Sequence, residues 1–191
     1  MSEKKNKTFV KDEELIQSIK DGNTDAFKEL VMRYKSQVAK TVYGMLGDCL
    51  EADDVGQETF IRFYEAIKSF RGESSLGTYL TRIAINLSLN ELKRRKRRSL
   101  FLPFKELDTL ENTPYKKSNI EQYETKEMVR YGIQQLEPQF RAVTVLRLID
   151  GYSTKETAEI LHIPEGTVLS RLARAEKKLR DILSPMMGSH I

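Results

Sequence analysis

Cysteine and histidine are scarce in this sequence of 191 residues, and their scarcity excludes several classes of site. Cys49 is the only cysteine, so an internal disulfide and a thiolate metal cluster are both ruled out. The two histidines, His162 and His190, do not group with carboxylates at the spacing of metal ligands, and we expect neither a metal nor a cofactor. A Gly-rich phosphate loop and a nucleophile elbow are also missing. No catalytic residues are evident, and the sequence predicts a protein that is not an enzyme.

Long apolar runs are missing as well. The mean hydropathy is −0.50, and no apolar stretch approaches the roughly 20 residues that a membrane-spanning helix needs. The first residues, Met1–Lys7, are polar and lack the apolar stretch of a signal peptide. We therefore expect no membrane insertion and a cytoplasmic location.

Positive charge is concentrated in one short run. Six consecutive basic residues, Lys93–Arg98, end a predicted helix; the formal net charge is +4 and would be −2 without them. Cations do suit the negative C-terminal pole of a helix, so a solvated helix end is one interpretation. That role would normally take one or two basic residues, and a run of six favours a surface that binds a polyanion such as nucleic acid.

Helical periodicity predicts an all-α fold of two small helical domains joined by a flexible linker. The first domain is expected over 11–98, with helix breaks at Asp21–Asn23 and Gly47–Asp48 and a loop at Phe70–Ser75 before a helix at 78–98. Thr24 or Asp25 can cap the second of its helices. Residues 99–124 have poor periodicity and two prolines, which is typical of a linker. The second domain is expected over 125–185, and nothing indicates a strand of any length.

The second domain contains a predicted helix-turn-helix. Ser153 and Glu156 form a capping box at the start of a short helix, a turn at 162–164 follows, and a long helix runs from about Glu165 to Leu183. One face of that helix is apolar. The other face carries side chains that suit a DNA major groove: Thr167, Ser170, Arg171, Arg174 and Lys178. An ordinary amphipathic helix with solvated cations is the alternative for any one of these residues.

The helix at 78–98 also has a polar stripe, formed by Arg82, Asn86, Asn90, Lys93 and Arg97. It follows a loop in which Gly72 gives backbone freedom. Amides and cations beside a flexible loop suit an exposed base, because an amide can read a Watson–Crick edge once the base leaves the stack. Composition alone leaves this single-strand interpretation level with plain duplex binding.

Two sets of residues resemble extracytoplasmic-function sigma factors of bacterial RNA polymerase. Asp53–Phe60, Phe70–Gly72 and Tyr79–Asn86 resemble region two of that family, and Asp150–Ser153, Ile163–Val168, Ser170–Leu172 and Arg174-Ala175 resemble region four. Both halves match in the family's order with a linker between them. The resemblance implies two helical domains that act as a transcription initiation specificity subunit, with core RNA polymerase and promoter DNA as partners and commonly an anti-sigma factor as an inhibitor.

The resemblance also implies roles for individual residues. The residues that would dock on the clamp helices of the largest polymerase subunit are Asp53, Asp54, Gln57 and Glu58. Those that would hold a flipped base and the nearby phosphates of the −10 strand are Phe70, Arg71, Gly72, Ser74, Tyr79, Arg82, Asn86, Asn90, Lys93, Arg94 and Arg97. Those that would read the −35 duplex are Thr167, Ser170, Arg171, Arg174 and Lys178.

The sequence departs from the family pattern at four places. Leu169 stands where the family usually has Lys or Arg, and Glu137-Pro138 reverses the usual order after Leu136. Gly56 lies inside the docking helix, and Tyr79 takes a place often held by Trp. One alternative is a stand-alone helix-turn-helix regulator of duplex operators, which would explain residues 153–183 but give the acidic helix near Asp53 no task. The other, a nucleic-acid-processing enzyme, would need an acid or metal cluster that the sequence lacks.

Overall fold

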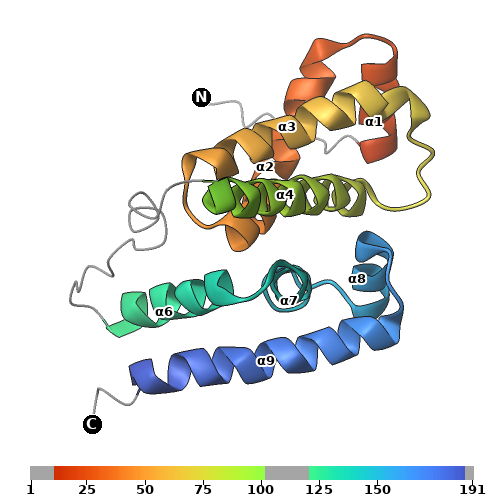
Figure 1. The fold of residues 1–191 in the computed structure, drawn as a ribbon. Coiled ribbons are helices and arrows are strands. Elements are labelled where there is room, and N and C mark those ends of the chain that lie inside the picture. The colour runs from red at the N-terminus through yellow and green to blue at the C-terminus, as the bar shows by residue number, and fades with distance from the viewer. Residues whose placement is uncertain (1–10, 102–120, 188–191) are drawn as a thin grey trace, which may run out of the picture.

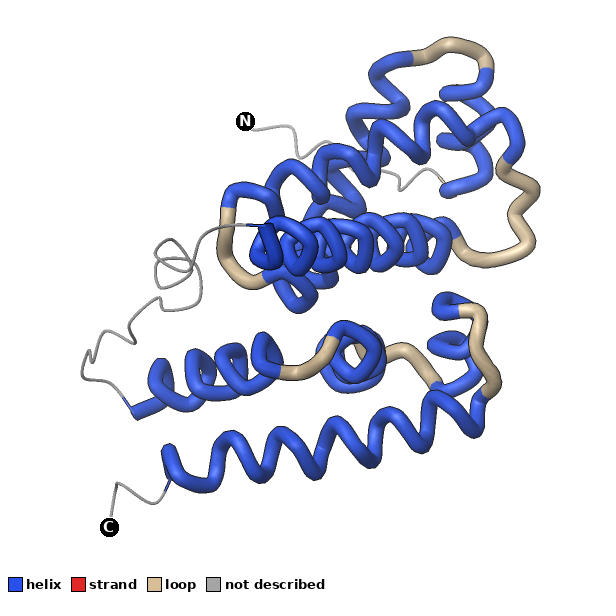
Figure 2. The backbone as a smooth tube through the Cα atoms, viewed as in Figure 1, coloured by secondary structure: helices blue, strands red, loops and turns tan. Residues whose placement is uncertain are grey.

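The computed structural model describes residues 11–101 and 121–187, and in these ranges every regular element is a helix. Figure 2 shows this all-helical course, and the predicted all-α class is confirmed. The N-terminal half consists of α1 (Asp12–Lys20), α2 (Thr24–Leu46), α3 (Leu50–Ala66), the short 3-10 helix η1 (Ile67–Ser69) and α4 (Leu76–Phe101). The C-terminal half consists of α6 (Glu121–Gln135), α7 (Pro138–Thr144), the π-helical turn η2 (Val145–Ile149), α8 (Thr154–Leu161) and α9 (Glu165–Met187). Residues 102–120 of the predicted linker lie outside the described ranges.

Capping residues explain where the helices of the N-terminal half begin. The cap of α2 is Asn23, whose Oδ1 accepts hydrogen bonds from the backbone N–H groups of Asp25 and Ala26, so the expected cap at Thr24 or Asp25 was wrong by one or two residues. The hydroxyl of Ser75 accepts from the N–H of Thr78, and α4 begins at Leu76 rather than at the expected Thr78. The helix then continues through Phe101, three residues into the segment expected to be linker.

The helix-turn-helix forms as its local signals predict. The Ser153 side chain accepts from the N–H of Glu156, and the Glu156 carboxylate accepts from the N–H of Ser153. His162 ends α8 in the left-handed conformation with φ 52°, which fits its expected role as a turn residue. Pro138 occupies the first turn of α7, where a missing N–H costs nothing, so the Glu137-Pro138 order starts that helix cleanly.

The two halves pack against each other along α2 and α4. Figure 1 shows the C-terminal half below the N-terminal half, with α9 on the side away from it. Helix α2 contacts α6, α7 and η2, while α4 contacts α7 and α8. One buried cluster includes Val42 and Met45 of α2 together with Val145 and Leu146 of η2. A Cβ built on Gly44 would lie 3.0 Å from the Val145 side chain, so α2 and η2 approach as closely as glycine allows.

Hydrogen bonds also cross this contact. The Arg141 guanidinium donates to the Met45 carbonyl at 2.7 Å, and Gln134 donates to the Gly44 carbonyl at 2.9 Å. Burial lowers the pKa of Arg141 to about 10. The Tyr152 hydroxyl lies 2.9 Å from both the Gln37 amide nitrogen and the Thr81 hydroxyl, which joins η2 and the start of α8 to α2 and α4. The two predicted helical domains therefore pack against each other within the described residues.

Candidate polymerase-docking and nucleic-acid-binding sites

The first site is a groove between α2 and α3. It has a volume of about 310 Å³, and apolar side chains of α2, including Val31 and Val38, meet Phe60 of α3 along it. Asp53, Gly56 and Gln57 of α3 also line this groove, with Asp53 and Gln57 about one helical turn apart on the helix surface. An apolar floor with a carboxylate and an amide at its edge is suited to a partner helix that brings cations and amides.

The four predicted docking residues all lie on α3. Asp53, Asp54 and Gln57 are exposed, and Glu58 is half-buried and accepts from Arg62 at 2.6 Å. The Tyr43 hydroxyl donates to Asp53, and this hydrogen bond raises the pKa of Tyr43. Sequence reasoning missed the contribution of α2, including Tyr43, because no sequence signal pairs it with α3.

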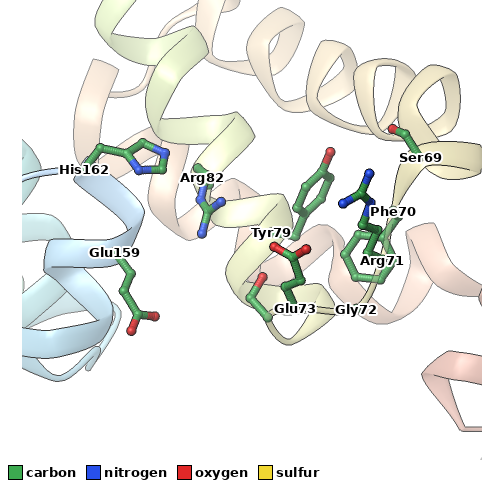
Figure 3. A pocket seen from close by; sticks show the side chains of 10 residues that line it. Ser69, Phe70, Arg71, Gly72, Glu73, Tyr79, Arg82, Glu159 and His162 are labelled. Atoms are coloured by element: carbon green, nitrogen blue, oxygen red, sulfur yellow. The ribbon is translucent and has the colours of Figure 1, made fainter.

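The second site is a hollow of about 580 Å³ beside the loop that precedes α4. Six of the predicted −10 residues line it together, and Figure 3 shows most of them: Phe70, Arg71, Gly72, Ser74, Tyr79 and Arg82. Gly72 has φ +74°, a conformation that favours glycine, and this turn carries the loop along the hollow. The hollow is polar, open and flanked by aromatic rings, which suits an unstacked base more than a regular duplex.

Aromatic packing fixes the inner wall of this hollow. The rings of Phe70 and Tyr79 meet edge to face with centroids 4.9 Å apart, and both pack against the buried ring of Phe63. The Arg82 Nε is buried and has no hydrogen-bond partner among the described residues. Arg82 also lines the hollow, and a guanidinium offers several N–H donors to a nucleotide that enters it.

Two lining residues of the hollow come from the C-terminal half. Glu159 of α8 and His162 at its end close one side, and Figure 3 shows both on the side where Arg82 lies. Sequence reasoning missed these two, because they are more than 75 residues from Arg82 in the chain and only the contact of α4 with α8 brings them there.

The remaining −10 residues continue along α4 outside the hollow. Asn86, Asn90, Lys93, Arg94 and Arg97 are all exposed. Arg94 pairs with Glu91 at 2.6 Å, whereas Lys93 and Arg97 make no ion pair with any described residue. Arg95 of the same basic run points inward: it donates to the Leu46 carbonyl at 3.3 Å and pairs with Glu91. The basic run therefore contains exposed side chains and one, Arg95, that holds α4 against α2.

The third site is the solvent-facing side of α9. Val168 and Ala175 are fully buried, and the helix packs on α6, α7 and α8 with that side. Of the predicted −35 residues, Ser170 and Arg174 are exposed, and Thr167 and Arg171 are half-buried. Lys178 is bonded to Glu137 at 2.8 Å and lies over the Phe140 ring, so it is tied to α7.

The outermost residues of α9 were not all predicted. Leu169, Ala173 and Lys177 are exposed beside Ser170 and Arg174. A helical projection centred on the buried Val168 and Ala175 would have found them, because the face opposite a buried stripe is the most exposed. The predicted −35 set instead contains only residues whose side chains can form hydrogen bonds.

The described residues contain no group of three or more His, Cys, Asp or Glu side chains close enough to hold a metal ion. In the same ranges no helix is long and apolar enough to cross a membrane.

Comparison with protein families finds two matches in the same chain. Residues 30–98 match the model of sigma-70 region 2, and residues 126–179 match that of sigma-70 region 4.

Several curated proteins are similar over nearly their full length. The RNA polymerase sigma-H factor of Pseudomonas aeruginosa is 33% identical, with 94% of this chain and 97% of that protein covered. The ECF RNA polymerase sigma factor SigW of Bacillus subtilis is 35% identical over 86% of this chain and 92% of its own. The ECF RNA polymerase sigma-E factor of Escherichia coli is 35% identical, with coverage of 92% and 96%.

Solved structures show the same fold at lower sequence identity. CnrH in complex with the cytosolic domain of CnrY superimposes with a TM-score of 0.64 at 24% identity, over 90% of this chain and 96% of that one. The sigma factor RpoE of Bartonella quintana, in complex with the anti-sigma factor NepR, gives a TM-score of 0.62 at 20% identity, over 83% and 96%.

Proposed function

This chain belongs to the sigma-70 family, among its extracytoplasmic-function sigma factors, and we propose how its three surfaces divide promoter recognition. As an RNA polymerase sigma factor, it binds core RNA polymerase, directs it to promoters with −35 and −10 elements and promotes melting of the −10 region. The stand-alone helix-turn-helix regulator is set aside, because that reading leaves the region 2 match at residues 30–98 unexplained.

The groove between α2 and α3 takes the clamp helices of the polymerase. Its apolar floor buries side chains of the partner helix, and Asp53 and Gln57 at its edge fix the register by pairing with cationic and amide groups. Asp54 and Glu58 extend the acidic surface along α3, where they steer association rather than anchor it. The docking surface lies wholly in the first domain, which we place at 11–98, and the helix-turn-helix lies in the second, which we place at 125–185.

The hollow at the start of α4 takes one unstacked base of the non-template −10 strand. The supporting observation is that Phe70, Tyr79 and Arg82 meet at one open polar hollow, with exposed Asn86 one turn further along the same helix. Aromatic rings and an arginine beside the loop hold the base, and Asn86 hydrogen-bonds its edge. Lys93 and Arg97 then contact phosphates of the same strand.

Melting follows from this arrangement without a chemical step in the chain itself. A hollow that binds an unstacked base stabilises the open promoter but makes no such contact with the closed duplex. The equilibrium between closed and open promoter therefore shifts toward the open state. Catalysis belongs to the polymerase, and this chain is not an enzyme. It acts in the cytoplasm, where the polymerase is, and the anti-sigma complexes of CnrH and RpoE support an anti-sigma factor as a further partner.

The experiment is transcription with purified core polymerase and this chain, followed by a permanganate footprint of the −10 region. We expect Asn86→Ala to reduce thymine reactivity about tenfold or more while closed-complex formation at low temperature stays within twofold, because the lost contact exists only with an unstacked base. Ser36→Ala, at an exposed position of α2 outside the docking groove, is the matched control and should leave both signals unchanged. An unaltered footprint for Asn86→Ala would contradict the assignment.

A further inference from the structure

Two apolar side chains stand on the outermost face of α9. Leu169 is 55% exposed, and Ala173, four residues later, is exposed beside it. Residues four apart on a helix are neighbours, so these two side chains form one small apolar ledge. Ser170 and Arg174 lie along one side of the ledge, and both are exposed.

A single exposed leucine on a protein surface is ordinary, and this one is informative because of its position. It lies in the first two turns of the second helix of a helix-turn-helix, the part that reaches base edges in the major groove. Helix α9 packs only on α6, α7 and α8 among the elements with substantial contacts, so its outer face is open although the two halves of the chain are in contact.

The chemistry of the major groove limits what such a ledge can recognise. Leucine and alanine side chains neither donate nor accept hydrogen bonds, and the only apolar group on the major-groove edges of the four bases is the C5-methyl of thymine. Against cytosine or guanine the same side chains would cover polar groups and leave them without water or a partner, which is costly.

We propose that Leu169, supported by Ala173, reads the methyl group of a thymine in the −35 element. The inference depends on the proposed function, in which α9 enters the major groove of that element. Ser170 and Arg174 then contact the neighbouring base pairs or phosphates. The −35 element that this protein recognises therefore contains a thymine at the position that faces Leu169. A lysine or arginine at position 169 would instead select a base with a hydrogen-bond acceptor.

The first experiment finds the sequence. Holoenzyme assembled from core polymerase and the full chain selects from promoters with a randomised −35 element and a fixed strong −10 element. The expected outcome is strong enrichment of thymine at one position, lost with Leu169→Ala and replaced by guanine with Leu169→Arg, because arginine grips guanine edges bidentately. Leu148→Ala changes a leucine that is 57% exposed on η2, outside α9, and should leave the selected sequence as it is.

The second experiment isolates the methyl group. Replacing that thymine with deoxyuracil removes one methyl and nothing else. The wild-type holoenzyme should bind the uracil promoter about fourfold more weakly, the fold-change equivalent to about 0.8 kcal/mol. Holoenzymes carrying Leu169→Ala should bind the two promoters equally, and those carrying Leu148→Ala should behave as the wild type.

The outcomes separate this inference from the function on which it depends. If no base is enriched anywhere in the −35 region, α9 does not read that element and the proposed function fails with it. If bases are enriched but thymine is not among them, or if uracil weakens the wild type and Leu169→Ala equally, only the role of Leu169 is wrong.

Discussion

At the scale of single residues, position on a helix decides what each basic side chain can do. The Arg95 guanidinium donates to the Leu46 carbonyl and pairs with Glu91, whose side chain is only 8% exposed. The positive charge of Arg95 is therefore largely neutralised within the protein. Lys93 and Arg97, two residues to either side, point to solvent. A run of like charges is therefore not one uniform patch, because 100° of rotation per residue carries its members around the helix.

Gly56 offers a test of backbone energetics in the docking helix. It lies inside α3, and a Cβ added there would meet nothing within 4 Å. We expect Gly56→Ala to stabilise the fold by about 1 kcal/mol, since glycine gives up more backbone freedom than alanine in a helix. The melting temperature should rise by about 2–4 °C in a thermal unfolding experiment.

Gly22 is the matched control for that substitution. A Cβ there would also meet nothing within 4 Å, but its φ is +92°, which L side chains rarely adopt. Gly22→Ala should therefore lower the melting temperature. A lower melting temperature for Gly56→Ala as well would show that the interior of α3 depends on the missing side chain in some other way.

At the scale of elements, α4 carries one end of the proposed −10 strand path. Lys93 and Arg97 have no ion pair with any described residue, and removing their charges with Lys93→Ala and Arg97→Ala should flatten the dependence of binding on salt. For a promoter with a preformed −10 bubble, we expect the slope of log Kobs against log salt to fall in magnitude by about 1–2, because each phosphate contact releases counterions.

Arg95→Ala is the informative comparison for this pair. It removes an equal kind of charge from the same run, but one that is bonded to the Leu46 carbonyl and to Glu91. We expect its salt slope to stay near the wild-type value while its melting temperature falls. Equal slopes for the Lys93/Arg97 double variant and the wild type would show that these two residues do not contact DNA phosphates and belong to an ordinary solvated helix end.

Individual elements also show how far the sequence alone could go. The Ser153–Glu156 capping box, the His162 turn and the start of the recognition helix were predictable, because each depends on residues within a few positions of one another. The all-helical class followed from periodicity for the same reason. The groove between α2 and α3 and the approach of Glu159 to Arg82 were not predictable, since both depend on which faces of separate helices pack together, and no local sequence signal sets that packing. The exposure of Ala173 could have been predicted from the apolar stripe of α9, because Ala173 lies on the opposite face. It was not predicted, because alanine is an apolar residue type.

At the scale of the whole molecule, the contact between the two halves includes a carboxyl group in an unusual setting. Asp150, just after η2, accepts from the Thr41 hydroxyl of α2 at 2.8 Å, and its Oδ1 is buried without a partner among the described residues. Burial raises the pKa of Asp150 to about 6, and the Thr41 hydrogen bond and the nearby Lys40 offset only part of that rise. The negative form is thus disfavoured by the packing of one half on the other.

This raised pKa gives a stability profile of definite sign. Between pH 4 and pH 6 the folded chain binds a proton at Asp150 that the unfolded chain has already lost, so the unfolding free energy falls as pH rises through that range. Asp150→Asn cannot titrate and should be free of this loss. Relative to wild type, we expect the variant to gain about 1 kcal/mol of unfolding free energy between pH 5 and pH 7.5, measured by urea unfolding at each pH.

Comparison of the two proteins at each pH is needed because other carboxylates act in the opposite direction. The hydrogen bond with Ser153 lowers the pKa of Glu156, and the one with Lys178 lowers that of Glu137, so both lose stabilisation as the solution becomes acidic. Thr41→Val supplies a second check: without its hydrogen-bond donor the Asp150 carboxylate becomes still less favourable, and the pH window of the difference should move upward. A constant difference between Asp150→Asn and wild type across this range would mean that the carboxylate reaches solvent, and that the two halves are not packed together there in solution.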